Sequence, residues 1–407
     1  MAKGFALLIL AVALASPALA GGWVGSWATS QQIPEPRNAL APEALNDATL
    51  RQIVHLSLGG KSLRVHLSNA FGTEPLHIDA AHVAKPLSPA GAAIDPKSDW
   101  ALTFQGRDDV TIPAGAEYIS DPVAFTAAPD SDLAITLHFE TAPAQQTSHP
   151  GSRATSYLAH GAQVSAADLP DAVKIDHWFN IAGVDVPAAE QTVAVVALGD
   201  SITDGRGSTT NGNDRWTDDL ARRLKGRIGV LNHGIGGGRV LRDGLGPNAL
   251  ARFDRDVLAQ PGVRYLIVFE GINDIGTFDP DATLPQAAHD GLVRELTSAF
   301  AQMVLRAHAA GIKVYGATIT PFVDCGPYHP GPASEADRVA VNAWIRAPGH
   351  FDTVIDFDRT VRDPARPDHL AAAYDSGDHL HPSAEGYRVM AAAIPLTLFS
   401  GRKGFTP

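Results

Sequence analysis

The amino-acid sequence predicts two domains, an all-β domain followed by an α/β domain built on a parallel sheet. Two observations predict this division. From about residue 21 to residue 187, apolar and polar residues alternate with the period of half-buried strands. After residue 192 the apolar residues instead form continuous runs, separated by segments with helical spacing. Such runs are typical of strands that are buried on both faces of a parallel sheet.

The first half contains strand signals and no long amphipathic helix. Residues 54–58 and 63–67 both alternate, and Gly59-Gly60 lies between them. This pattern predicts a hairpin whose glycines supply positive φ angles. Alternation continues in three later segments, residues 100–104, 110–112 and 133–139. We therefore expect residues 21–187 to form a β-sandwich or jelly-roll-like accessory domain.

The second half, residues 192–400, reads as repeated strand–helix units. Its first strand is the apolar run 193–198, and Trp216, Leu220 and Leu224 share one face of the helix that follows. Further strands are expected at 228–231, 265–270, 312–318 and 354–357, and further helices at 287–310, 334–346 and 383–398. This order predicts a doubly wound α/β domain, joined to the first domain by residues 187–192. Ligands of such domains bind at the carboxyl ends of the strands.

The N-terminus has the pattern of a secretory signal peptide. Lys3 precedes an apolar run from Phe5 to Ala15, and small residues end the segment at Ala20. The run is shorter than the roughly 20 residues of a membrane-spanning helix, and no later stretch is long enough. We therefore expect residues 1–20 to be removed and the protein to be secreted or periplasmic, without a membrane span.

The charge of the chain argues against nucleic acid as a partner. Without residues 1–20 it carries 31 basic and 44 acidic side chains and no basic run. Cys325 is the only cysteine, so an internal disulfide is impossible, and a buried or incidental thiol is a simpler interpretation than a nucleophile. The sequence does not determine the oligomeric state.

Ser201 is the first candidate for chemistry. It lies in Gly199-Asp200-Ser201-Ile202, directly after the first buried strand. A serine on such a strand-to-helix turn exposes its hydroxyl at the edge of the sheet, as in a nucleophile elbow. The alternative is a turn serine that only caps the next segment.

Asp378-His379-Leu380-His381-Pro382 supplies a candidate base. Serine needs a base to take its proton, and a carboxylate usually holds that base in one tautomer. Asp378 and His381, three residues apart before a predicted helix, can meet this need locally. One alternative is a loop histidine that pairs with an aspartate without any catalytic role. The other is a metal site at His379 and His381. No H-E-x-x-H motif accompanies them, so we expect no metal.

Two further loops fit an oxyanion hole. Asn273 follows the strand that ends at Glu270, and its side-chain amide can donate to a developing oxyanion. The glycines of segment 232–238 follow the second strand and allow backbone N–H groups to converge on an anion. Each loop alone is a weak signal, because glycine-rich loops after strands are common.

Taken in order, these four segments resemble the SGNH/GDSL hydrolase family of serine esterases and acylhydrolases over about residues 192–398. The resemblance implies a flavodoxin-like three-layer domain with Ser201 as nucleophile, His381 as base and Asp378 as its orienting acid. It also implies Gly237 and Asn273 as oxyanion donors beside the Ser201 amide. Ile202 replaces the usual leucine, and the run Gly236 to Gly238 leaves the exact glycine open by one position.

The resemblance therefore implies an esterase that needs no cofactor. An accessory β-domain is similar to that of exported members acting on polysaccharide esters, so we expect a short acyl group, first of all acetyl, on a carbohydrate. The alternatives are a general aryl- or lipid esterase and an inactive carbohydrate-binding protein. Phe278, Phe322 and Tyr328 are candidate pocket residues or ordinary loop packing. The sequence leaves open the acyl group, the alcohol or sugar, and the role of the β-domain.

Overall fold

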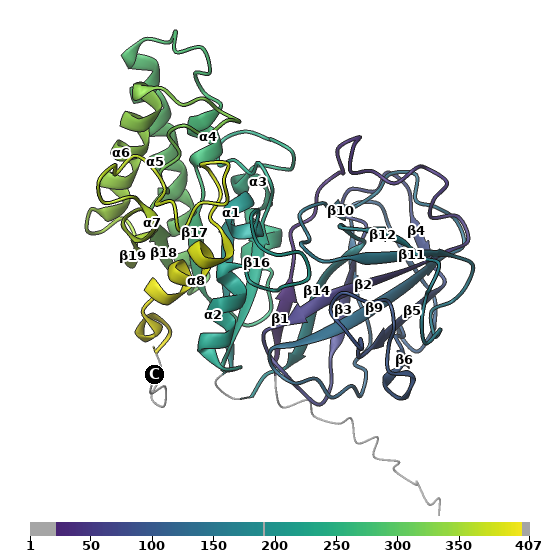
Figure 1. Ribbon diagram of the computed structural model, residues 1–407. Coiled ribbons are helices and arrows are strands. Elements are labelled where there is room, and N and C mark those ends of the chain that lie inside the picture. Colours follow the sequence, from purple (N-terminus) through teal and green to yellow (C-terminus); the bar gives the residue numbers. More distant parts are fainter. Residues whose placement is uncertain (1–21, 190–191, 401–407) are drawn as a thin grey trace, which may run out of the picture.

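The computed structural model describes residues 22–189 and 192–400. The predicted signal peptide, residues 1–20, lies outside these ranges. The β-rich half and the α/β half lie side by side, with β1 (Trp23–Ala28) and β16 (Ile228–Gly234) at their junction (Figure 1). The predicted fold class is confirmed in both halves.

The first half is built from antiparallel strands, and within residues 22–189 its only helix is the short 3-10 turn η1 (Pro96–Ser98). Its larger sheet has the order β12 (Val173–Ile175), β11 (Ser156–His160), β2 (Ala48–Leu56), β9 (Ser131–Phe139), β5 (Ala80–Ala84) and β6 (Trp100–Ala101). A second sheet has the order β1, β14 (Ile181–Pro187), β3 (Arg64–Ser68) and β8 (Glu117–Ile119). Two small ladders pair β10 (Ser148–His149) with β13 (Trp178–Phe179), and β4 (Leu76–Ile78) with β7 (Val110–Ile112).

The two larger sheets share one hydrophobic core. Alternate residues of β2 and β9, such as Leu50 and Leu137, join Val65 of β3 and Val184 of β14 in the same buried cluster. All four side chains are completely buried. The alternation that was visible in the sequence therefore marks the inner faces of a sandwich.

The predicted hairpin around Gly59-Gly60 is wrong. β2 pairs with β9 and β11, whereas β3 pairs with β14 and β8 in the other sheet. Neither glycine has a positive φ. Gly59 instead allows a close approach, because a Cβ there would lie 2.6 Å from the carbonyl oxygen of Ala127. The glycines therefore mark the place where the chain crosses between sheets.

The second half contains a five-stranded parallel sheet. Its order is β16, β15 (Val193–Gly199), β17 (Val263–Phe269), β18 (Lys313–Ala317) and β19 (Thr353–Ile355). Numbered along the chain, this is the flavodoxin-like order 2-1-3-4-5, in which a ligand binds where the strand order reverses. That point lies beyond the ends of β15 and β17, which Ser201 and Asn273 follow.

Helices cover this sheet, with α5 packed against α6 and α2 against α8. The helices are α1 (Ser201–Asp204), α2 (Trp216–Leu224), α3 (Ala249–Phe253), α4 (Ile272–Gly276), α5 (Gln286–Ala309), α6 (Pro332–Arg346), α7 (Phe357–Val361) and α8 (Ala384–Ala393), with a π-turn η2 (Asp254–Leu258) and a 3-10 turn η3 (Leu396–Phe399). The last helix is shorter than predicted, because Pro395 forces Ile394 into an extended conformation. In the described ranges, none of the helices has both the length and the apolar character needed to cross a membrane.

The two halves approach closely where β1 lies against β16. A Cβ on Gly229 of β16 would come within 2.1 Å of the carbonyl oxygen of Gly25 in β1. The Gly25 amide donates to the carbonyl of Pro261 at 3.0 Å, and the Val230 amide donates to the Ser57 hydroxyl at 2.9 Å. Two residues without side chains therefore allow direct backbone contact between the halves.

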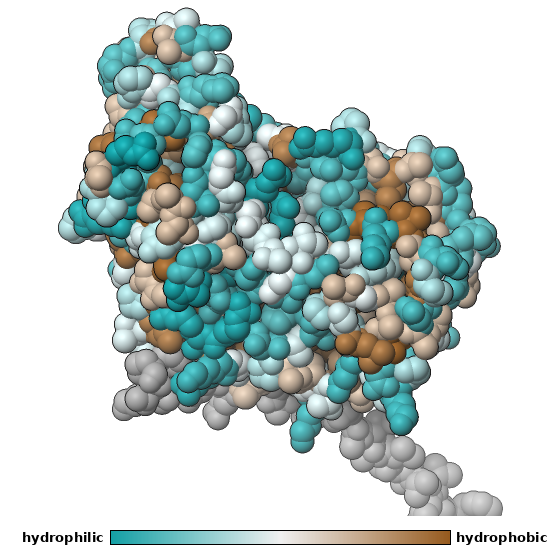
Figure 2. Space-filling model, viewed as in Figure 1, coloured by the Kyte–Doolittle hydropathy of each residue, from teal (hydrophilic) through white to brown (hydrophobic). Residues whose placement is uncertain are grey.

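The face shown in Figure 2 is mostly hydrophilic, with small separate hydrophobic patches. The most exposed large apolar side chains, Leu87 and Val173, belong to the β half. Single exposed apolar residues are ordinary on protein surfaces and need no partner to explain them.

Candidate active site

Ser201 is the first residue of α1, two residues after the end of β15. The Asp200 carboxylate accepts a hydrogen bond from the Ile202 amide at 2.9 Å and so caps this helix. Gly205, with a φ of 104°, ends the helix after one turn. The serine is thus held on a sharp strand-to-helix turn, and 9% of it remains exposed.

His381 and Asp378 approach this serine from the loop before α8. Asp378 Oδ1 accepts the amides of Leu380 at 3.1 Å and His381 at 2.8 Å, which curls the loop. His381 Nδ1 then lies 2.6 Å from Asp378 Oδ2, and Nε2 lies 2.8 Å from Ser201 Oγ. The structure therefore brings these three residues into one hydrogen-bonded chain.

The charge of Asp378 determines which nitrogen of His381 carries the proton. Burial acts to raise the pKa of Asp378, but hydrogen bonds from the side chain and the amide of His381 outweigh burial and hold this pKa well below its usual range. The carboxylate accepts the Nδ1 proton, so Nε2 of a neutral His381 is free to accept the proton of Ser201.

Asn273 and the glycine loop lie at the same end of the sheet. Asn273, in α4, is almost completely buried. Its Nδ2 donates to the carbonyl of Gly238 at 2.7 Å, and its Oδ1 accepts the hydroxyl of Tyr328. These two bonds fix the plane of the amide and leave one N–H of Nδ2 for another acceptor.

The three adjacent glycines differ in their availability. The Gly238 amide already donates to the carbonyl of Ile235 at 2.9 Å. Gly236 and Gly237 line the pocket that contains Ser201, and Gly237 has a φ of 67°. The assignment of the oxyanion donor stays a prediction, and Gly238 is the least suitable of the three because its N–H has a partner.

Only one of the three aromatic candidates reaches the pocket. Tyr328 lines it beside His381. Phe322 is completely buried, because the chain after β18 turns its ring into the hydrophobic core. Phe278 packs edge-on against His289 of α5, with 5.4 Å between ring centroids, and does not line this pocket. The proposed pocket role is therefore wrong for Phe278 and Phe322.

The pocket at Ser201 has a volume of about 530 Å³ and is lined by both halves of the molecule. The α/β half contributes Ser201, His381 and Tyr328, among others. The β half contributes seven polar or charged side chains, those of Gln32, Glu35, Arg37, Asn38, Arg153, Asp176 and His177. Sequence reasoning missed them all, because no motif or spacing marks them.

A buried ionic cluster lies behind the nucleophile turn. Arg252 donates to Glu270 and to the carbonyl of Gly199, both at 3.0 Å, and to Asp256 at 3.0 Å. Burial raises the pKa of Asp200 to about 7 and that of Glu270 well above its ordinary value. The pKa of Asp256 is shifted in the opposite direction. Burial would raise this pKa, but Arg255, His233 and Arg252 lower it to about 2.

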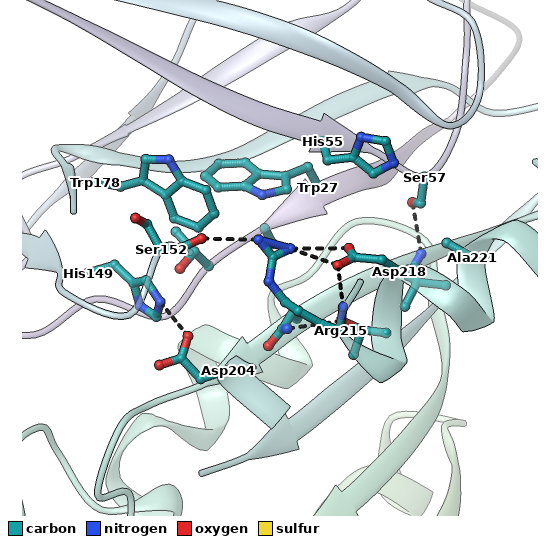
Figure 3. Close-up of a pocket in the computed structure, with 15 residues that line it drawn as sticks. Trp27, His55, Ser57, His149, Ser152, Trp178, Asp204, Arg215, Asp218 and Ala221 are labelled. Atoms are coloured by element: carbon teal, nitrogen blue, oxygen red, sulfur yellow. Dashed lines mark hydrogen bonds and ion pairs between the residues drawn. The ribbon is translucent and has the colours of Figure 1, made fainter. Parts of the chain in front are cut away.

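A second histidine–aspartate pair joins the two halves at α1. His149 Nε2 of β10 lies 2.9 Å from Asp204 Oδ1 (Figure 3). Its Nδ1 donates to the Ser30 carbonyl at 2.8 Å. Both side chains are almost completely buried. The sequence offered only one clue to this pair, an aspartate one helical turn after Ser201.

His379 and His381 do not converge on a common point. His379 Nδ1 lies 2.5 Å from Asp375, whereas His381 faces Ser201. In the two described ranges, no three His, Cys, Asp or Glu side chains lie together in a way that would hold a metal ion. Cys325 is buried, and burial raises the pKa of its thiol.

Comparisons with known proteins concern the second half of the chain. Solved structures that resemble it include a GDSL-like lipase from Bacteroides thetaiotaomicron, 21% identical, with 51% of this chain and 89% of that chain covered and a TM-score of 0.38. A carbohydrate acetylesterase from Sinorhizobium meliloti is 17% identical, with 51% and 99% covered and a TM-score of 0.39. No curated protein sequence matches the chain.

Residues 197–389 match the model of the GDSL-like lipase/acylhydrolase family. This stretch includes the turn at Ser201, the glycine loop, Asn273, and the loop with Asp378 and His381. Its parallel sheet has the flavodoxin-like strand order 2-1-3-4-5. Residues 197–389 therefore form a GDSL-like lipase/acylhydrolase domain, which makes the protein a carboxylic ester hydrolase.

Proposed function

We propose that this protein is an exported serine esterase that removes short acyl groups, first of all acetyl, from carbohydrates. The observation that carries the proposal is Ser201 Oγ, 2.8 Å from His381 Nε2, in a pocket lined mainly by polar and charged side chains. The export step rests on the pattern of residues 1–20 and predicts a mature N-terminus at Gly21, which N-terminal sequencing of the secreted protein tests.

In the proposed mechanism, His381 takes the proton of Ser201 as its oxygen attacks the carbonyl carbon of the ester. The oxyanion accepts hydrogen bonds from the Ser201 amide, the Gly237 amide and Nδ2 of Asn273. His381 then gives its proton to the leaving alcohol, and an acyl-serine remains. Water, deprotonated by His381, releases the acid and restores the serine. No cofactor takes part.

The lining of the pocket supports a short acyl group and a polar alcohol. Each methylene of a bound acyl chain gains about 0.8 kcal/mol only where apolar surface covers it. Leu245 and Leu380 are the aliphatic side chains among the described lining residues, apart from two prolines. The other side chains offer hydrogen-bond donors and acceptors, which suit the hydroxyl groups of a sugar.

The first test is the loss of activity in Ser201→Ala. We expect release of p-nitrophenol from its acetate ester to fall by at least about 10⁴-fold. Ser208→Ala is a matched control, because Ser208 lies nearby and does not line the pocket, and its hydroxyl bonds to the carbonyl of Gly205 and to no other group in the described part of the chain. Turnover of the Ser201 variant at the rate of the control would contradict the mechanism.

The second test is the substrate profile. We expect acetyl esters to be the best p-nitrophenyl substrates, and mass spectrometry to detect acetate released from acetylated polysaccharides. A maximum at long acyl chains would instead favour a lipid esterase. Aryl esters cleaved with no release from any polysaccharide would favour a general arylesterase. Glycan binding without any turnover would favour a binding protein.

A further inference from the structure

Three arginines without acidic partners line the pocket at Ser201. They are Arg37, Arg153 and Arg206. Among the described residues, none of their side chains forms a hydrogen bond or an ion pair. Other arginines of the chain, such as Arg252 and Arg338, bind carboxylates. Guanidinium donors therefore remain available beside the nucleophile.

Arg153 is the most firmly placed of the three. Its backbone has a φ of 49°, a conformation that arginine rarely adopts. Its carbonyl accepts the Asn211 amide at 2.9 Å, and the Ser152 hydroxyl bonds the carbonyl of Ala154 at 2.8 Å. Its Nε is buried without a partner among the described residues. A buried unpaired donor is costly, so something must offset that cost.

The loop that carries Arg153 is fixed on both sides. His149, at its start, binds Asp204, and Arg215 of the α/β half donates to the Ser152 carbonyl at 3.0 Å (Figure 3). Gly151 lies so close to Asp204 that a Cβ would come within 1.7 Å of Oδ2. His177 Nδ1 donates to the carbonyl of Pro150 at 2.7 Å. Arg153 is thereby held in a fixed position relative to α1 and Ser201.

The acidic residues of the pocket already have partners. Asp378 binds His381 and Asp204 binds His149. Glu35 accepts the side-chain amide of Asn38 at 2.6 Å, and Asp176 accepts the hydroxyl of Thr155 at 3.0 Å. None of these carboxylates forms an ion pair with a pocket arginine. Within the described ranges, each of these carboxylates thus has a partner other than a pocket arginine, although Asp204 Oδ2 is buried without one, and the guanidinium donors remain unpaired.

We propose that the pocket takes esters whose alcohol part carries a carboxylate, such as an acylated uronic acid residue, and that Arg153 binds this carboxylate with Arg206 beside it. A guanidinium offers paired N–H groups that match the two oxygens of a carboxylate, and it stays charged at all working pH values. The inference rests on the proposed esterase function and narrows its substrate class.

Two matched esters test the inference. The probe is para-acetoxybenzoate, and its methyl ester is the uncharged comparison, since both release acetate from the same phenol oxygen. We expect Arg153→Gln to lower kcat/KM for the carboxylate by about 10- to 100-fold, the loss of a charge-assisted hydrogen bond. The loss for the methyl ester should be at least about fivefold smaller, because no charge pair is broken there. Arg206→Gln should act in the same direction and more weakly.

Arg294→Gln is the control for charge alone. Arg294 lies in α5, outside this pocket, and also has no partner among the described side chains. The Arg294→Gln substitution should leave the ratio of kcat/KM for the two esters unchanged. If Arg153→Gln does not fold, Arg153→Lys, which keeps the charge but loses the paired donors, takes its place and should show a smaller loss of the same kind.

The possible results distinguish a failure of the carboxylate site from a failure of the proposed esterase function. The inference would be overturned if Arg153→Gln lowered kcat/KM equally for both esters, or if the wild-type enzyme hydrolysed the two esters with the same kcat/KM. Either result would leave the proposed esterase function standing. A protein that hydrolyses neither ester would overturn both. A selective loss for the carboxylate in the Arg153 variant, and a weaker one in the Arg206 variant, with Arg294→Gln like wild type, would support the site.

Discussion

The pair His381–Asp378 and the pair His149–Asp204 both contact α1, with similar distances of 2.6 and 2.9 Å between nitrogen and carboxylate. They differ at the second ring nitrogen. In His381 this nitrogen faces the hydroxyl of Ser201, which can give up a proton. In His149 it faces the carbonyl of Ser30, which can only accept one. His149 must therefore keep a proton on Nδ1.

This difference separates a base from a structural tie. His381 can carry a proton between Ser201 and a leaving group, because its Nε2 alternates between acceptor and donor. His149 has acceptors at both nitrogens, so it cross-links the β half to α1 and does not exchange protons with substrate. A histidine next to an aspartate thus indicates catalysis only when its other nitrogen meets a group with a proton to give.

The largest expected effect follows from changing His381. His381→Gln should lower kcat by about 10⁵- to 10⁶-fold, because Ser201 loses its base. The melting temperature should stay close to that of the wild type, since a glutamine amide can still donate a hydrogen bond to Asp378. Steady-state kinetics and thermal unfolding measure the two quantities. A residual rate within tenfold of wild type would remove the distinction between the pairs.

The second-largest effect on kcat is expected for Asp378→Asn. The asparagine keeps the shape of the side chain but presents an amide to Nδ1, which favours the wrong tautomer of His381. We expect kcat to fall by about 10⁴-fold. The pH dependence of the remaining rate would show whether the base has changed. A rate near that of wild type would mean that Asp378 does not orient the histidine.

Substitutions in the pair His149–Asp204 should lower the stability of the protein more than its activity. His149→Gln or Asp204→Asn leaves one member of a buried pair alone, at a cost of about 3–5 kcal/mol in the free energy of unfolding. Below the unfolding transition we expect kcat to fall by less than about tenfold, because no proton path is lost. Denaturant unfolding and kinetics on the same samples test this. A 10³-fold loss of kcat without loss of stability, on the scale expected for triad residues, would instead make His149 part of the proton path.

The smallest expected effect concerns Asp200, which caps the helix that both pairs hold. Burial raises its pKa to about 7 in the folded protein, from 3.8. The folded state therefore binds the proton of the Asp200 carboxyl group more tightly than the unfolded state does. Protonation of Asp200 stabilises the folded state, and this contribution is complete below the unfolded pKa. It is lost as pH rises through about 7. Unfolding free energies measured between about pH 5 and pH 8 should fall by on the order of 2 kcal/mol, since Asp200 and Glu270 share the effect.

Asp200→Asn is the control for that pH dependence. The asparagine oxygen can still accept the Ile202 amide, but it cannot ionise. The variant should lose stability less steeply over the same pH range. An identical slope in both proteins would assign the effect to Glu270 or Asp274, whose pKa values burial also raises.

The parallel sheet and the site residues of the second half were accessible from the sequence for a physical reason. Strands buried on both faces have continuous apolar runs, and polar motifs that directly follow them must lie at one edge of the sheet. Asp378 and His381 are three residues apart, so their contact is local. Ser201 and Asn273 follow β15 and β17, which are neighbours in the sheet.

The β half was harder to predict. Alternation shows which residues face inward but not which strands pair, and so it predicts a hairpin at Gly59, where the chain instead crosses between sheets. The contact of His149 with Asp204 spans 55 residues and has no local signature. The same holds for Arg153, whose place at the pocket depends on how two domains meet. Phe278 and Phe322 were misplaced because an aromatic residue in a loop after a strand packs inward as readily as toward a ligand.

The close backbone contact at Gly25 and Gly229 has a consequence for anyone who wishes to use the hydrolase half as a separate module. β16 is the outer strand of its sheet, and β1 of the other half lies against it. Cutting the chain before β15 would uncover the apolar side chains of β16, including Val230 and Leu231, which are now buried, on a free sheet edge. Such edges template self-association. Chimaeric enzymes should therefore exchange both halves together, or carry a redesigned β16.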